Sequence, residues 1–376
     1  MKLSDIVDRI NGNVDRFNTD LEYYIGGEHM DSNELLITDR GLLKENLGKL
    51  GFKFHFAFQE RDVIFMARNP HLRKAGMVMF SGLCSDASYI LRSKDENVIT
   101  QEYLAIQLQS DHFWDYCERT KVGSVNFANN WTSIANYEFD LPSIDEQKEI
   151  SQKVWAAYRL KESYKKLLAA TDEMVKSQFI EMLGERTTTP VGYYIKDSFP
   201  GDWGKEDLDG TGVKVIRTTN FTNFGKLNLS EVVTRSIEER KIQKKQILKY
   251  DTILERSGGT ADNPVGRVVL FEEDEQYLCN NFTQVLRFKD IDPRFAFYAL
   301  FYFYQMNKTS IRSMGSKTTG IQNLNMSKYL EIGIPNADED EQKQFVSIAE
   351  QADKSKFELR KSIEAIDAVI KSLINN

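Results

Sequence analysis

Two copies of the tripeptide Glu-Gln-Lys, Glu146–Lys148 and Glu341–Lys343, contain residue types found in metal-dependent nuclease sites. In such a site the carboxylate and the lysine need a further carboxylate from a neighbouring strand, so that a metal can be held. Both triplets instead follow predicted helix-capping residues, since Ser143 stands three residues before Glu146 and Asn336 three before Glu339. Acidic side chains there suit the helix dipole. The pattern therefore favours two helix starts over two catalytic centres.

Three other patterns that could support chemistry are incomplete. The Asn-Pro dipeptides at Asn69 and Asn263 lack the second proline and the aromatic residue of an adenine methyltransferase motif, so turns explain them better. The segment Arg256–Thr260 contains two glycines without the Gly-Lys-Ser/Thr ending of a phosphate-binding loop. The few histidines and cysteines lack the spacing of a zinc site, and no spacing marks a Cys/His nucleophile pair. The sequence therefore shows no self-sufficient active site.

The two triplets lie in two versions of one segment, residues 141–184 and 334–376. Each copy opens with an apolar residue and a proline, passes through the triplet and continues as a long polar stretch with regularly spaced apolar residues. The triplets lie 195 residues apart, and the match continues without a gap. A repeat at such a long spacing indicates duplicated domains rather than a solenoid.

The apolar residues of each copy recur three and four apart, which predicts a coiled-coil seam. Helices of this length would be rods of roughly 60 Å. Two helices of matching register most simply pair antiparallel, and two separate amphipathic surface helices are the alternative. The predicted pairing positions are Ile150, Val154, Ala157, Tyr164, Leu168 and Val175, with Phe345, Ala349, Ala352, Leu359, Ile363, Ile366 and Ile370 in the second copy. A lysine, Lys161 or Lys356, interrupts each seam.

A body of mixed composition precedes each helix, and the two bodies share a faint common frame. Leu83-Cys84 and Leu91-Arg92 are matched 195 residues later by Leu278-Cys279 and Leu286-Arg287. Short apolar runs between turn residues predict strands, and helical patterns occur near 101–117 and 293–306. The predicted strands are Phe52–Phe58, Val63–Met66, Met77–Phe80, Val213–Ile216, Thr252–Leu254 and Val268–Phe271. We therefore expect each body to be a mixed α+β domain.

Composition and charge limit the possible partners. The 376 residues suffice for two domains with their own cores. Of the net charge of −7, residues 1–140 carry −6, 141–184 carry 0, 185–333 carry +2 and 334–376 carry −3. This balance predicts weak DNA binding by the chain alone, because phosphate neutralisation supplies most non-specific affinity. The basic run from Arg235 to Lys249 is either part of a DNA-binding surface or an ordinary solvated face.

Cysteine usage and hydropathy bear on location. Three cysteines without a Cys-x-x-Cys motif, and no signal-peptide-like start, predict a cytoplasmic setting. No apolar run approaches the roughly 18–20 residues of a membrane span, so no membrane partner is expected.

The order body, helix, body, helix resembles the specificity subunit of a Type I restriction–modification system. The helical motifs that carry the resemblance are fairly specific, whereas the bodies match only in outline. Leu183 stands where this family often has phenylalanine. The matching motifs are Leu141-Pro142, Asp145–Ile150 and Lys176–Gly184 in the first helix, and Ile334-Pro335, Asp340–Lys343 and Asp353–Phe357 in the second.

The resemblance implies an α+β fold with a pseudo-two-fold internal repeat. Target recognition domains at 1–140 and 185–333 would be joined and separated by long antiparallel coiled-coil helices at 141–184 and 334–376. Each domain would read one half of a bipartite, asymmetric site in double-stranded DNA, and the helices would set the spacer. The chain would be a non-catalytic subunit without a bound cofactor. Two methyltransferase subunits would dock on the helices and supply S-adenosylmethionine and adenine-N6 methylation, and translocating endonuclease subunits could join them.

Polar side chains at corresponding loops of the two bodies are the candidate base readers. Arg and Lys can bridge guanine, Asn can read adenine and Glu can accept from cytosine. The first body offers Glu28, His29, Arg68, Asn69, His71, Arg73, Lys74, Ser124, Asn126 and Asn129; the second offers Arg217, Thr218, Thr219, Asn220, Arg256, Ser257, Lys317, Thr318 and Thr319. An ordinary loop or turn role is the alternative for each residue.

Two further classes of function remain open. A stand-alone sequence-specific DNA-binding regulator should bind DNA tightly without partners. An enzyme with a divergent nuclease centre at the triplets should show metal-dependent cleavage that Glu146→Gln or Glu341→Gln abolishes.

Overall fold

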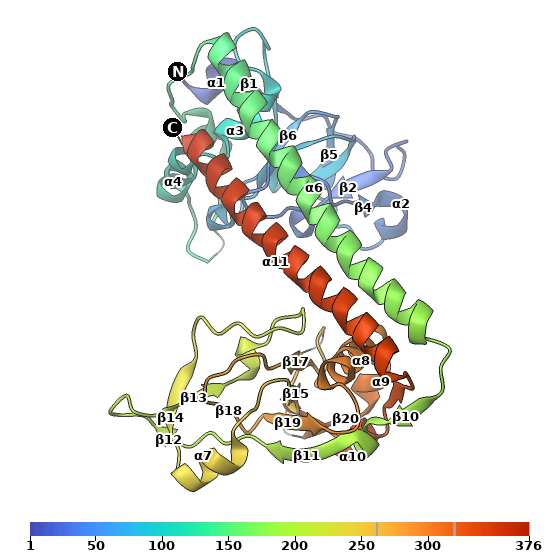
Figure 1. The fold of residues 1–376 in the computed structure, drawn as a ribbon. Helices are drawn as coiled ribbons and strands as arrows, with labels where there is room; N and C mark the ends of the chain where they lie inside the picture. Colours follow the sequence, from blue (N-terminus) through green and yellow to red (C-terminus); the bar gives the residue numbers. More distant parts are fainter. Residues whose placement is uncertain (126, 261, 319–320, 376) are drawn as a thin grey trace. The chain divides into compact units, whose positions relative to one another are not determined.

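The computed structural model describes residues 1–125, 127–260, 262–318 and 321–375, with only the backbone of Lys317 and Thr318 (Figure 1). The chain divides into two compact units. The first consists of Met1–Leu167 and Glu358–Asn376, and the second of Leu168–Phe357. The long helices α6 (Ile144–Leu183) and α11 (Glu339–Asn375) each contribute residues to both units.

Two sheets form the frame of the first unit. One has the strand order β1-β9-β6-β7-β3 and the other β4-β2-β8-β5. Strands β2 and β8 are parallel, as are β3 and β7, and the other neighbours are antiparallel. The bounds are β1 Val7–Ile10, β2 Tyr23–Ile25, β3 Leu36–Ile37, β4 Gly41–Leu42, β5 Phe54–Phe58, β6 Val63–Met66, β7 Ala75–Val78, β8 Gly82–Ser85 and β9 Ser88–Ser93. The strands predicted at Phe52–Phe58, Val63–Met66 and Met77–Phe80 are confirmed within a few residues.

Helices cover one side of this frame. A single apolar cluster joins Phe65 of β6, Trp114 of α4, Val154 of α6 and Ile370 of α11. Thr100 and Ser110 cap α3 and α4 by accepting backbone N–H groups, which explains where these helices begin. The bounds are α1 Leu3–Ile6, α2 Leu43–Asn46, α3 Gln101–Gln107, α4 Asp111–Thr120 and α5 Trp131–Ala135, with 3₁₀ turns η1 Gly27–His29 and η2 Pro70–Leu72.

The second unit contains two four-stranded sheets, ordered β11-β19-β15-β17 and β12-β14-β13-β18, and two smaller ones, β16-β21-β20 and β10-β22. Its strands are β10 Thr188–Pro190, β11 Ile195–Pro200, β12 Lys205–Glu206, β13 Val213–Ile216, β14 Val233–Ser236, β15 Thr252–Glu255, β16 Ser257–Gly258, β17 Val268–Leu270, β18 Tyr277–Cys279, β19 Thr283–Phe288, β20 Gly315–Thr318, β21 Ile321–Leu324 and β22 Gly333–Pro335. Its helices are α7 Glu239–Lys245, α8 Pro293–Met306, α9 Lys308–Ser313 and α10 Met326–Leu330, with 3₁₀ turns η3 Val191–Tyr194 and η4 Thr218–Asn220. The strands and the helix predicted for this body are confirmed.

The two units follow one plan. The order β1-β9-β6-β7 in the first corresponds to β11-β19-β15-β17 in the second, and the parallel pair β2/β8 corresponds to β13/β18. A buried aspartate binds the arginine of the matching strand in each unit, Asp62 with Arg92 and Asp251 with Arg287, at 2.7 Å in both. The mixed α/β class predicted from the sequence is confirmed.

The long helices start with capping boxes. At α6 the predicted cap is confirmed, since the Ser143 N–H donates to the Glu146 carboxylate at 2.8 Å. At α11 the prediction of Asn336 with Glu339 is wrong. Asp338 caps this helix, accepting the Glu341 N–H at 2.9 Å, while its own N–H donates to the Glu341 carboxylate. The Asn336 amide instead donates to Thr187, upstream of β10.

Each unit contains an antiparallel stretch of α6 against α11. In the first unit, Val154 and Ile370 are buried in one cluster, and Ile150, Ala157 and Ile366 lie at its edge. In the second, the Phe179 and Phe345 rings are 5.3 Å apart. Val175, Phe345, Ala349 and Ala352 are buried together there. The remaining predicted seam positions, Tyr164, Leu168, Leu359 and Ile363, are half-buried.

Candidate nucleic-acid interface

In the first unit, the parallel strands β2 and β8 end at the same edge of their sheet and place candidate readers there. The chain leaves β2 into η1, which presents Glu28 and His29. The His29 ring accepts the Gly26 N–H at 3.0 Å, while the Glu28 side chain is 63% exposed. The Lys74 ammonium donates to the Gly27 carbonyl at 2.7 Å. Three of the predicted base readers, Glu28, His29 and Lys74, therefore lie together.

A second loop cluster of this unit contains Arg68 and Asn69. Arg68 pairs with Ala128 in an isolated bridge, and the Asn69 N–H donates to the Phe127 carbonyl at 2.8 Å. Asn69 has a left-handed φ of 53°, a conformation that asparagine tolerates better than most residues. Arg68, Asn69 and Ser124 are exposed, whereas Asn126 lies outside the described residues.

His71 and Arg73 lie toward the helices of this unit. Arg73 binds the Asp111 carboxylate of α4 at 2.5 Å and lowers the pKa of that carboxyl. Both residues line a hollow with Lys371 of α11. The Arg73 charge is therefore engaged within the protein, and His71 remains exposed.

In the second unit, the parallel strands β13 and β18 end at one edge in the same way. The Asn280 N–H donates to the Ile216 carbonyl at 2.9 Å, and the Arg256 N–H donates to the Phe282 carbonyl at 2.8 Å. The loops that carry Arg217 and Arg256 therefore flank the segment that follows β18. Arg217 Nε is buried and has no hydrogen-bond partner among the described residues. Arg217, Thr218 and Arg256 are half-buried and Thr219 is exposed, so this edge can present polar side chains to a ligand.

Three predicted readers are buried and are hydrogen-bonded within the protein. The Asn129 amide donates to the Cys117 carbonyl at 2.8 Å. The Asn220 amide donates to the carbonyls of Asn228 and Glu231 at 3.0 and 2.9 Å. The Ser257 hydroxyl donates to Asn323 of β21 at 2.7 Å. These side chains hold loops in place, because buried polar groups need such partners.

The hairpin β20–β21 carries the last predicted readers. Lys317 and Thr318 belong to β20, and Thr319 lies outside the described residues. Strand β21 also pairs with β16, which follows Arg256 directly. The backbone of the hairpin is therefore connected to the Arg256 loop.

The basic run of the second unit is largely engaged within the protein. Arg235 stacks over the Trp203 ring at 4.4 Å. Lys241 and Lys245 approach the Asp202 carboxylate at 3.8 and 3.4 Å, and Lys249 binds Asp274 at 2.9 Å. These pairings favour the interpretation as a solvated face over a phosphate-binding surface.

The residues of the candidate catalytic patterns have structural roles. Glu146 and Glu341 belong to the capping boxes, and positive φ angles occur at Gly258, the last residue of β16, and at Gly259, which follows it. Cys84, Cys117 and Cys279 are buried, and burial raises the pKa of the Cys84 thiol to about 12 and of the Cys279 thiol to about 11. Among the described residues, no three His, Cys, Asp or Glu side chains are grouped as a metal site. The described helices include none that is long and apolar enough to span a membrane.

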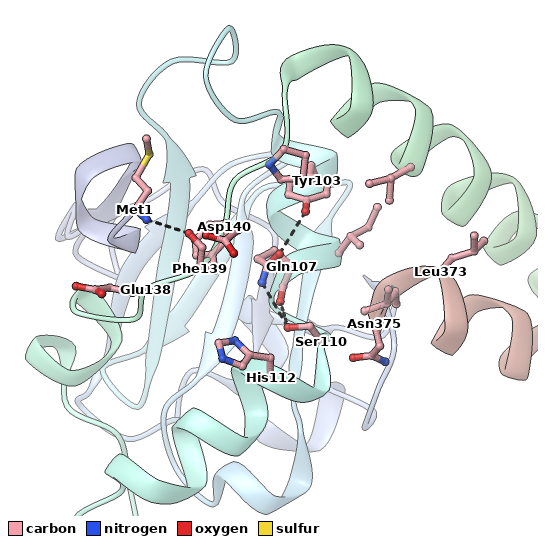
Figure 2. Close-up of a pocket in the computed structure, with 14 residues that line it drawn as sticks. Met1, Tyr103, Gln107, Ser110, His112, Glu138, Phe139, Asp140, Leu373 and Asn375 are labelled. Carbon is pink, nitrogen blue, oxygen red and sulfur yellow. Dashed lines mark hydrogen bonds between the residues drawn. The ribbon is translucent and has the colours of Figure 1, made fainter.

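The first unit contains a hollow of about 730 Å³, and Figure 2 shows the residues that line it. Gln107 of α3, His112 of α4, Ile150 of α6 and Leu373 of α11 are among its lining residues. The amino group of Met1 donates to the Phe139 carbonyl at its edge, at 2.9 Å. None of the predicted base readers lines it, so it is separate from the loop clusters above.

Comparisons with known proteins find a domain match for part of the chain and a similar fold for all of it. Residues 198–367 match the Type I restriction modification DNA specificity domain. The fold is similar to the Type I restriction–modification S subunit from M. genitalium, with 11% identity over 100% of this chain and 94% of that chain and a TM-score of 0.59. A chain from a structural study of type I restriction–modification complex assembly and conformational transition gives 15% identity over 100% and 95%, with a TM-score of 0.56. No curated protein matches the sequence.

The resemblance found in the sequence is confirmed by the domain match together with the fold. Residues 198–367 therefore match a Type I restriction–modification DNA specificity domain, and the whole chain has a fold similar to that of a Type I S subunit. Specificity subunits are the non-catalytic members of such systems.

Proposed function

We propose that each unit reads one half of a bipartite, asymmetric sequence in double-stranded DNA. The observation that carries this proposal is one strand plan with different side chains at its matching edge. The exposed Glu28 follows β2 in the first unit, and the exposed Thr219 holds the corresponding place after β13 in the second. Because base edges are read by hydrogen-bonding side chains, one frame with different polar residues suits two different half-sites.

In this proposal, α6 and α11 pair along their lengths as an antiparallel coiled coil and fix the spacer between the half-sites. The antiparallel stretch found within each unit supports such pairing. A continuous helix rises about 1.5 Å per residue, so its length is a natural ruler for the separation of two readers.

The same proposal assigns the chemistry to partner subunits. Two methyltransferase subunits dock on the helices, bind S-adenosylmethionine and methylate adenine N6, and endonuclease subunits can add DNA cleavage. The similarity to a chain studied in type I complex assembly supports such partners. The acidic balance of the chain also fits, since subunits with basic surfaces would supply phosphate contacts that this chain lacks. We place the complex in the cytoplasm, where it would meet chromosomal DNA.

The test is modified-base sequencing of genomic DNA from the host with and without this gene. A two-part motif with N6-methyladenine in both halves should vanish when the gene is deleted. A deletion of four residues within 150–175 should then shift the spacer or abolish methylation, while the half-sites stay the same. Unchanged methylation after gene deletion would refute the role, and tight DNA binding by the purified chain alone would favour a stand-alone regulator.

A further inference from the structure

The surface on which each body packs against its long helix can be compared position by position. The Leu35 carbonyl accepts the Met77 N–H at 2.8 Å in the first unit, and the Gly225 carbonyl accepts the Leu270 N–H at 3.1 Å in the second. The donors Met77 and Leu270 lie in β7 and β17, which are the corresponding strands of the two units. The next residues in the chain, Leu36 and Lys226, therefore hold equivalent places.

On the helix side, the 195-residue repeat supplies the equivalent positions. Trp155 and Tyr158 of α6 correspond to Glu350 and Asp353 of α11. Two buried aromatic residues in one copy thus stand where the other copy has two carboxylates.

In the first unit this docking face is apolar with an acidic edge. Leu36, Met79 and Trp155 line a hollow of about 510 Å³. Beside it, the Glu34 carboxylate binds Lys161 and Lys165 of α6 at 3.1 and 2.9 Å. The body therefore contributes an acid, and the helix contributes two lysines.

In the second unit the polarity is reversed. The Lys226 ammonium lies 3.3 Å from the Asp353 carboxylate and 2.6 Å from Glu272. Tyr298 also donates to Asp353, at 3.0 Å. Burial alone would lower the pKa of Lys226, but Asp353 and Glu272 outweigh it and raise that pKa. Here the body contributes the cation, and the helix contributes the acid.

We propose that these two docking faces assign each body to its own position in the chain. The inference rests on the proposed function, because the position of a body decides which half of an asymmetric site it reads. If the second body replaced the first, Lys226 would keep Glu272 of its own body but would meet Tyr158 instead of Asp353, and Arg294 would meet Trp155 instead of Glu350. At the same time Lys161 would lose Glu34. Placing these partly buried cations against apolar rings removes one carboxylate from each and is unfavourable, so the exchanged body would pack poorly.

The test is a chain in which residues 185–333 also replace residues 1–140. This duplicated chain and the natural chain are each tested in two forms. In one form α6 is unchanged, and in the other it carries Trp155→Glu and Tyr158→Asp, which recreate the face of α11. The duplicated chain should unfold at a lower temperature and give no methylated motif in cells that contain the partner subunits. The two substitutions should restore a site with the same half on both sides. In the natural chain, the same pair should lower Tm by roughly 4 °C or more.

Equal Tm and equal methylation of the duplicated chain with and without the two substitutions would overturn the inference. If neither form of the duplicated chain accumulates in cells, the variant Lys226→Glu of the natural chain tests the inference instead. It should lower Tm by roughly 4 °C or more, whereas Lys249→Glu, at an exposed ion pair, should barely change it. Equal effects of the two variants would overturn the inference. Absence of any bipartite motif from the natural chain counts against the proposed function instead, and the Tm comparison still tests the docking faces.

Discussion

Lys356 of α11 is the repeat equivalent of Lys161 of α6, and each of these buried lysines binds an aspartate of the other helix. Lys161 lies 2.8 Å from Asp367, and Lys356 lies 2.8 Å from Asp172. The two aspartates are also 195 residues apart, so the pairing itself is duplicated. Because a buried polar residue in an apolar seam penalises other registers, this contact can fix how the helices align within each unit.

Removing one aspartate tests this contact. Asp172→Asn should lower the free energy of unfolding by about 1–3 kcal/mol, because Lys356 keeps its charge and retains only Asp353. The low end is expected, since Asp172 is 45% exposed. Denaturant unfolding measures the change. Glu173→Gln, at the exposed neighbouring position, is the matched control, and an equal effect of both variants would contradict a register role.

The ion pairs of Glu34 should make stability depend on pH. Burial alone would raise the pKa of Glu34, but hydrogen bonds and charge from Lys165 and Lys161 outweigh it and hold that pKa below its ordinary value of 4.5. A carboxyl with a lowered folded pKa stabilises the fold above its unfolded pKa and loses this contribution as pH falls through the folded pKa. Glu34→Gln should therefore lower Tm at pH 7, and the difference from the natural chain should shrink below about pH 4.5. A difference that persists unchanged at pH 3 would contradict this assignment.

The capping boxes separate a structural role of the Glu-Gln-Lys triplets from a catalytic one. Glutamine at position 146 can still accept the Ser143 N–H, so Glu146→Gln should leave methylation by the complex unchanged. The purified chain with Mg²⁺ should leave plasmid DNA intact. Asp338→Ala, in contrast, should cost about 1 kcal/mol of stability, measured by thermal unfolding, because α11 loses its cap. Cleavage that disappears in Glu146→Gln would revive the nuclease alternative.

The sequence was sufficient to predict elements with a periodic apolar pattern, but it could not predict which single polar side chains are buried. The strand at Val63–Met66 and the helix at 293–306 follow from apolar runs and periodicity, which packing in the structure preserves. Asn336 and Asp338 are both good capping residues two positions apart, so local propensity could not choose between them. The choice depends on β10 and the residues just before it, because Thr187 and Thr189 bind the Asn336 side chain.

The same limit applies to the candidate base readers that are buried in the structure. Asn220 lies in a polar tetrad, Arg217–Asn220, that looks uniform in the sequence. Only the tertiary fold brings the carbonyls of Asn228 and Glu231 to its amide. The matching residue of the first unit has the same role in the structure: the His29 ring accepts the Gly26 N–H as the Asn220 side chain accepts the Arg217 N–H, so both residues close the same turn. Side chains that close the turn at equivalent places in both units are better candidates for structure than for readout.

Arg217 and Asn220 therefore give opposite predictions within one turn. Arg217 Nε is buried without a partner among the described residues, and a guanine N7/O6 edge would satisfy such a donor. Arg217→Ala should relax one base position of a single half-site, at a cost of about 1–3 kcal/mol in binding, with little change in Tm. Asn220→Ala should lower Tm because two carbonyls lose their donor. Methylation motifs and thermal unfolding of both variants separate the two roles. Relaxation in both half-sites, or none with Arg217→Ala, would exclude Arg217 as a base reader.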